Sequence, residues 1–171
     1  QDEVLEVCES VVSDIFRTFS DKKVTESPFR RIPYAESMAK YGSDKPDLRN
    51  PLIICDLTDF FADVDFPAFK GKPVRGIVAN CQGKSNKFFE DSLKFATSSE
   101  VGLGGLGYIT LKEGVFLGPI AKFLTDEKKA EITKLTGVKE GETLFFICDD
   151  KKNDTEKKAG HIRTWLAGKD Q

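Results

Sequence analysis

Apolar residues near the N-terminus recur at the spacing of an α-helix. They leave one apolar and one polar side over about 17 residues. The apolar set consists of Val4, Leu5, Cys8, Val11, Val12, Ile15, Phe16 and Phe19. Asp2 and Glu3 lie in the first turn, where the helix dipole favours negative charge. The pattern predicts an amphipathic helix that starts almost at the first residue, which suggests an excerpt from a longer protein.

A second, shorter helical pattern covers Tyr34–Tyr41 and leads into the densest run of turn-forming and charged residues, Tyr41–Asn50. Gly42 frees the backbone, and Pro46 forces the residue before it out of the helical region. Ser43 and the aspartates of this run can accept hydrogen bonds from the nearby backbone. A helix cannot continue through such a run, so it predicts a junction between two differently patterned parts of the chain.

From residue 52 onward, short β-type runs alternate with helical patterns. The predicted strands cover 52–55, 74–81, 106–111 and 144–148, and the predicted helices cover 56–62, 85–97, 125–137 and 153–167. Leu144–Cys148 is continuously apolar, which is typical of a central strand buried on both faces. This order predicts an α+β, ferredoxin-like sandwich with a mainly antiparallel sheet and helices on one face, preceded by the amphipathic helix.

Two of the predicted helices begin with capping signals. Thr125 precedes Asp126 and Glu127, so it is expected to be an N-cap. Asn153 and Glu156 have the spacing of a capping box at the start of the last helix.

The four cysteines argue against a metal site. Cys8, Cys55, Cys81 and Cys148 are far apart, with no CxxC pair. They are expected to be buried free thiols in a reducing cytoplasm. No apolar run reaches the ~20 residues of a membrane span, and no secretory leader is recognisable.

Charge is spread evenly along the chain. The 171 residues hold 26 basic and 28 acidic side chains, a net charge of −2, and no third of the sequence is a basic block. A protein that grips nucleic acid by itself usually has a clustered basic surface. The distribution therefore leaves open an interaction domain with no nucleic-acid role.

Two motifs favour structural over catalytic interpretations. Gly102–Gly107 matches GxGxxG, but a helix precedes it and a strand follows, the reverse of a dinucleotide site. We interpret it as a flexible connection. His161 is the only histidine and has no evident acidic partner, so we expect a structural role for it and no catalytic or metal-binding residues.

Tyr41–Arg49 reads YGSDKPDLR, a string of mixed chemistry that resembles the signature of bacterial-type aspartyl-tRNA synthetases. Further segments are similar to that family: Gly118–Leu124 to its SPIAKFL, Gly137–Phe146 to its GAxxGDxIFF, and Gly160–Arg163 to its GALR. Residues 79–105 and Cys148–Asp150 depart from the pattern. In that family the string lies in the catalytic domain, just before an inserted GAD domain.

The resemblance implies a class II synthetase segment at 1–50 and a GAD insertion domain at 51–171. It implies a parent that attaches aspartate to tRNA with ATP and Mg²⁺ and forms a homodimer. The family's ATP, magnesium and amino-acid motifs match nothing in this sequence. We therefore expect residues 1–171 to bind no cofactor, to be inactive and monomeric alone, and to assist tRNA positioning at most.

The alternative is a GAD binding module from a tRNA-dependent amidotransferase subunit, which shares the domain. The YGSDKPDLR string favours the synthetase because it belongs to that enzyme and not to the domain itself.

Two groups of side chains are candidates for function. Asp44, Lys45, Asp47 and Arg49 are predicted to pair with each other or with neighbouring loops and to fix the angle between two domains. Lys128, Lys129, Lys151 and Lys152 are candidates for contact with tRNA, although such runs are usually solvated helix ends.

Overall fold

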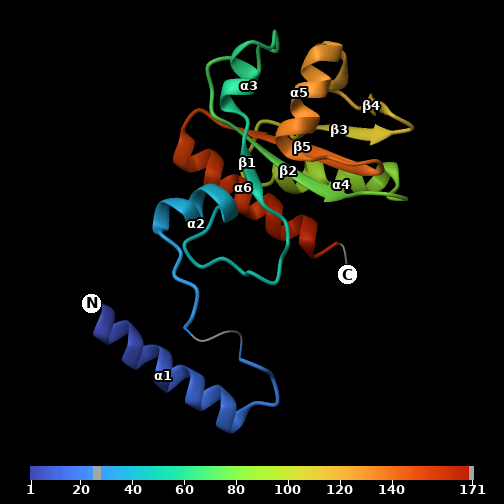
Figure 1. The fold of residues 1–171 in the computed structure, drawn as a ribbon. Helices are drawn as coiled ribbons and strands as arrows, with labels where there is room; N and C mark the ends of the chain where they lie inside the picture. Colours follow the sequence, from blue (N-terminus) through green and yellow to red (C-terminus); the bar gives the residue numbers. More distant parts are fainter. Residues whose placement is uncertain (25–27, 170–171) are drawn as a thin grey trace. The chain divides into compact units, whose positions relative to one another are not determined.

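A computed structural model describes residues 1–24 and 28–169 of the chain (Figure 1). The chain divides into two compact units, Gln1–Pro33 and a larger one that begins at Tyr34. Residues 34–50 thus belong to the same unit as the sheet.

The N-terminal unit contains helix α1 (Asp2–Phe19), which confirms the predicted amphipathic helix. Arg31 pairs with Asp2 over 2.8 Å, and the backbone N–H of Phe29 donates to Glu9 Oε1. These two contacts hold Phe29 and Arg31 along the polar side of the helix. The apolar side is exposed, with Phe19 83% accessible.

The larger unit is built on a five-stranded sheet in the order β1-β2-β5-β3-β4 (Figure 1). The strands are β1 (Ile54–Asp56), β2 (Val74–Asn80), β3 (Gly107–Lys112), β4 (Val115–Leu117) and β5 (Glu142–Cys148), and every pairing is antiparallel. In the register of the central strand, Phe145 lies opposite Ile77 and Tyr108. The predicted α+β class and antiparallel sheet are confirmed.

The sequence pattern did not predict the edge strand β4. It pairs with β3 through a tight hairpin in which Lys112 lies opposite Val115. The two turn residues, Glu113 and Gly114, both have positive φ, at 53° and 74°. Such a primed turn matches the twist of paired strands, and Glu-Gly is a weaker signal for it than Asn-Gly.

Helices cover both faces of the sheet, so the prediction of helices on one face is wrong. Helices α4 (Asn86–Ala96) and α6 (Lys152–Ala167) pack on one side, and α3 (Thr58–Ala62) and α5 (Asp126–Thr136) pack on the other. The cause lies in β5, whose alternate residues Leu144 and Phe146 face one core while Phe145 and Ile147 face the other. A strand that is apolar on both sides needs a cover on both.

The succession β2-α4-β3-β4-α5-β5 has the βαββαβ element order of ferredoxin-like sandwiches, although the predicted order lacked β4, and these four strands lie in the sheet in the order β2-β5-β3-β4. A 3₁₀ helix (Ala121–Phe123) lies between β4 and α5. Helix α2 (Tyr34–Tyr41) packs against α6 and β1.

One of the two predicted caps is present. Thr125 is the N-cap of α5, and its hydroxyl accepts a hydrogen bond from the backbone N–H of Lys128 at 3.3 Å. The capping box at Asn153 is wrong, because α6 starts earlier with Lys151 as a cap that forms no side-chain cap bond. Glu156 turns instead toward the sheet.

We predict that Thr125→Ala lowers the free energy of unfolding by about 1 kcal/mol, since it removes the acceptor for the Lys128 N–H. Ser85→Ala is the matched control, because Ser85 is the N-cap of α4 but makes no side-chain cap bond. Urea unfolding of both variants measures the difference. Equal losses would show that the Thr125 bond contributes nothing.

A buried ionic network joins α6 to the sheet. Arg75 on β2 is 2% exposed, and its Nη2 lies 3.0 Å from Glu156 Oε1, also buried. Its Nη1 lies 2.7 Å from Asp56 Oδ1 and donates to Thr58 Oγ1 at 3.1 Å. A buried charge is tolerated only when it is paired and hydrogen-bonded, and this network meets that requirement for both Arg75 and Glu156.

Candidate functional site: the junction segment on helix α6

The junction segment, defined as residues 41–52, begins where helix α2 ends. Gly42 adopts φ +66°, and its N–H donates to Met38 O at 2.9 Å, which closes the last helical turn. Ser37 Oγ then donates to Ser43 O at 2.7 Å, and Ser43 Oγ accepts from the N–H of Lys45. The local turn chemistry read from the sequence is thus present in the structure.

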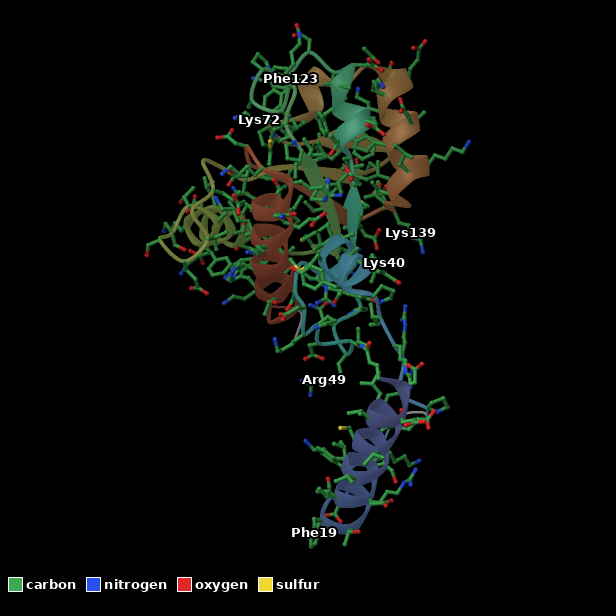
Figure 2. All side chains as sticks on the ribbon, turned by 90° about the vertical axis from the view of Figure 1, so that its left-hand side faces the viewer. Phe19, Lys40, Arg49, Lys72, Phe123 and Lys139 are labelled. Carbon is green, nitrogen blue, oxygen red and sulfur yellow. The ribbon has the colours of Figure 1, made fainter. Side chains whose placement is uncertain are left out.

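The charged residues of the segment pair with each other. Lys45 Nζ lies 2.6 Å from Asp44 Oδ2, and Arg49 Nη2 lies 2.7 Å from Asp47 Oδ2. Hydrogen bonds from Arg49 lower the pKa of Asp47 to about 2. All four side chains are largely exposed, and Arg49 projects outward (Figure 2). Each pair joins near neighbours in sequence, so neither attaches the segment to another element.

Arg163 on α6 attaches the segment, and the sequence did not reveal this role. Its Nε donates to Leu52 O at 2.6 Å, and its Nη2 donates to Asp47 O at 3.1 Å and Asn50 O at 2.8 Å. Its guanidinium carbon lies 5.0 Å from the centre of the Tyr41 ring, a cation–π contact. Burial lowers the pKa of Arg163. The GALR-like string was the available signal, because it places this arginine beside Gly160.

Gly160 and Gly42 meet at the other end of the segment. A Cβ built on Gly160 would lie 2.4 Å from Gly42 O, and one built on Gly42 would lie 2.3 Å from Glu156 O. Real Cβ atoms do not approach backbone atoms so closely. Only glycine at both positions allows α2 to end against α6 in this way.

The four candidate lysines do not gather on one face. Lys128 and Lys129 are both part of α5. Lys128 pairs with Glu131 and lies 4.9 Å from the ring of Phe60 on α3, and Lys129 pairs with Asp126. Lys151 and Lys152 stand at the start of α6, on the opposite side of the sheet. Their contact with tRNA stays a prediction.

A cleft of about 1100 Å³ lies in the larger unit. Its wall includes the glycine-rich loop, which follows α4 and leads into β3, as predicted. Lys158 Nζ pairs with Asp149 and donates to Gly102 O, while Lys72 pairs with Asp150. Aromatic side chains line the rest of it: Phe66, Phe69, Phe89 and Tyr108. Because both lysines are neutralised, the cleft offers no net positive charge to a phosphate.

Cys148 also lines this cleft. Burial raises the pKa of its thiol to about 11. The thiolate is the reactive form, so at pH 8 only about one thiol in a thousand is reactive.

We predict that iodoacetamide modifies Cys148 far more slowly than the exposed Cys8 at pH 8, and that the Cys148 rate rises about tenfold per pH unit up to pH ~11. Peptide mass spectrometry measures both rates, with Cys148→Ser to assign the site. Equal rates for the two cysteines at pH 8 would contradict the prediction.

His161 is exposed in the middle of α6. Across 1–24 and 28–169, no three His, Cys, Asp or Glu side chains come together as a group that could hold a metal ion. Within the same ranges, no helix has both the length and the apolar character to cross a membrane.

The sheet-and-helix unit with its central βαββαβ succession is an α+β domain of one family. Residues 67–158 match the GAD domain model, and the chain belongs to the GAD domain family.

The similarity to curated proteins extends well beyond that domain. Over 98% of its length the chain is 44% identical to an "Aspartate--tRNA(Asp/Asn) ligase" of Rickettsia bellii, and over 97% it is 43% identical to one of Wolbachia pipientis subsp. Culex pipiens. It spans 28% of the length of each relative. The solved structure "Hypothetical protein PH0730 from Pyrococcus horikoshii OT3" aligns with 58% of this chain and 52% of its own at TM-score 0.42 and 17% identity, too remote a likeness to carry an argument.

Proposed function

We propose that this chain is the GAD-bearing part of an aspartate–tRNA ligase, a cytoplasmic class II enzyme that joins aspartate to tRNA with ATP and Mg²⁺. One observation carries the proposal: the similarity to ligases covers 95–98% of the chain, whereas the GAD model covers only residues 67–158. The matched remainder includes α1 and the junction segment. An amidotransferase subunit that shares only the domain would leave that remainder unmatched.

Within such a ligase, the chain has an auxiliary role. The resemblance places the groups that bind ATP, Mg²⁺ and aspartate outside residues 1–171, so the chain alone is expected to be inactive. The GAD domain would then help to position tRNA while the rest of the homodimeric enzyme performs the chemistry. The even charge distribution and the paired lysines of the cleft argue against strong binding of tRNA by the domain alone. They are consistent with a weak contact made within the whole ligase.

Two activities of the complete ligase test this proposal. A ligase containing this chain should catalyse aspartate-dependent exchange of pyrophosphate into ATP and should charge tRNA with aspartate. Both tRNA(Asp) and tRNA(Asn) are tested, because the relatives' names give both acceptors. Failure to charge either tRNA would overturn the ligase assignment, and exchange activity in residues 1–171 alone would overturn the auxiliary role.

Binding of the chain alone to tRNA(Asp), at low and physiological salt, tests the positioning role. An unrelated tRNA serves as the control. Selective binding whose log affinity falls by about 0.7–0.9 per log unit of salt for each phosphate contact would make the domain a recognition element in its own right. No binding at either salt is the expected result for a domain that acts only within the whole ligase.

A further inference from the structure

We propose that Arg163 is a positioning residue that makes the junction segment part of the rigid body of the sheet. The GAD domain then cannot swing on residues 41–52 as it would on a linker. The consequence for tRNA charging rests on the function proposed above, but the rigidity itself does not.

Backbone carbonyls of the junction segment are hydrogen-bonded by Arg163 of helix α6. Residues 42–53 form no helix or strand, so their carbonyls lack a regular ladder. Arg163, only 3% exposed, supplies donors to the carbonyls of three positions between 47 and 52. A planar guanidinium holds such acceptors at fixed directions, and charge-assisted bonds of this kind are strong when water is excluded.

The segment also donates a hydrogen bond to the backbone of α6. Asn50 Nδ2 donates to Arg163 O at 3.2 Å, and Asn50 Oδ1 accepts from the N–H of Leu52 at 3.0 Å. Asn50 thus joins the helix backbone to the exit of the segment.

The junction segment contacts α6 at two separate points. Gly160 meets Gly42 at the start of the segment, and Arg163 meets residues 47–52 at its end. These two helix residues are three apart and therefore lie on one side of α6. A single contact would leave the segment free to rotate, whereas two contacts separated along it fix its direction.

The exposed ion pairs cannot perform this task. Asp44 pairs with Lys45 and Asp47 with Arg49, one and two residues away. If those pairs were the positioning device, Arg49→Met would have the effect that we assign to Arg163→Met. The two substitutions therefore separate the two explanations.

Amide hydrogen exchange on the full chain is the first experiment. In Arg163→Met, the hydrogen-bonded amides of Lys45, Arg49 and Leu52 should exchange at least about tenfold faster, while the amides of β2 and β5 keep their rates. Arg163→Lys keeps the charge but loses the fork, so its acceleration should be intermediate. Lys94→Met, on the exposed side of α4, is the control and should change neither region.

Asn50→Ala keeps the test decisive if Arg163→Met does not fold, since it loosens the segment and leaves the arginine in place. It should give the same pattern of exchange with a smaller acceleration. Equal acceleration of the segment and of β5, no acceleration in either, or an Arg49→Met effect as large as that of Arg163→Met would overturn the proposal.

Kinetics of a ligase containing this chain test the consequence. Arg163→Met should raise KM for tRNA at least about fivefold and leave aspartate-dependent pyrophosphate exchange unchanged, because only the placement of the domain is altered. Unchanged charging by a variant with a loosened segment would overturn the positioning role. If the unsubstituted ligase charges no tRNA, the proposed function fails. The amide hydrogen exchange of the chain still decides whether Arg163 makes the junction segment rigid.

Discussion

Replacing Arg75 with methionine should lower the free energy of unfolding by about 3–5 kcal/mol, the largest loss that we expect from a single side chain. The substitution leaves Glu156 buried without the guanidinium at 3.0 Å, and its remaining cation, Lys152, is 3.9 Å away. An unpaired charge in a low-dielectric core is costly. Urea denaturation followed by circular dichroism measures the loss.

A double variant identifies the cause of that loss. Arg75→Met with Glu156→Leu removes both buried charges and should recover most of the stability, since apolar residues of similar size often replace a buried pair without cost. Asp56 is 59% exposed and can return to solvent. A double variant as unstable as Arg75→Met would show that packing of the arginine stem, rather than the orphaned carboxylate, dominates.

The second large effect is expected at the glycine contact. Alanine is favoured over glycine inside a helix by about 1 kcal/mol, so Gly160→Ala would stabilise an isolated α6. In the protein the added methyl group meets Gly42 O at 2.4 Å, a backbone atom that cannot move aside alone. We therefore predict a loss of roughly 2–4 kcal/mol, opposite in sign to the helix preference.

Two further glycine variants complete this test. Gly42→Ala should be as harmful, because it combines the close approach with φ +66°. Gly71→Ala isolates the cost of the backbone conformation, since Gly71 has φ +72° and nothing within 4 Å of a built Cβ; a loss of about 1 kcal/mol is expected there. If Gly160→Ala stabilises the protein and Gly42→Ala costs no more than Gly71→Ala, the close contact between α2 and α6 contributes nothing beyond the backbone strain at Gly42.

Most local features of this protein could be predicted from its sequence. Helical patterns predicted α1 and α2, and turn-forming residues predicted the end of α2 at Gly42. Helix α5 begins after Thr125 and ends at Gly137, as predicted. The uninterrupted run at Leu144–Cys148 identified the central strand. These features depend on interactions between residues that are close in sequence, so a short stretch of sequence is enough to predict them.

The candidate site was only partly predictable. The charged residues of the junction segment pair with each other, one of the two outcomes that the sequence allowed. Their role in fixing an angle between domains stays a prediction. Arg163 holds the backbone of the same segment. Apart from its place in the GALR-like string it gave no local signal, because its acceptors are carbonyls that every residue carries.

Which distant residues meet depends on the packing of the folded domain and could not be predicted from local patterns. Glu156 fits a capping box in sequence, yet its partner is Arg75, 81 residues away on β2. Arg163 and Asp47 are 116 residues apart, and the meeting of Gly42 with Gly160 depends on how α2 crosses α6. Periodicity shows which positions are apolar but not which side of the sheet a helix will cover. Packing of the whole domain sets that choice, because the two apolar faces of β5 must both be buried.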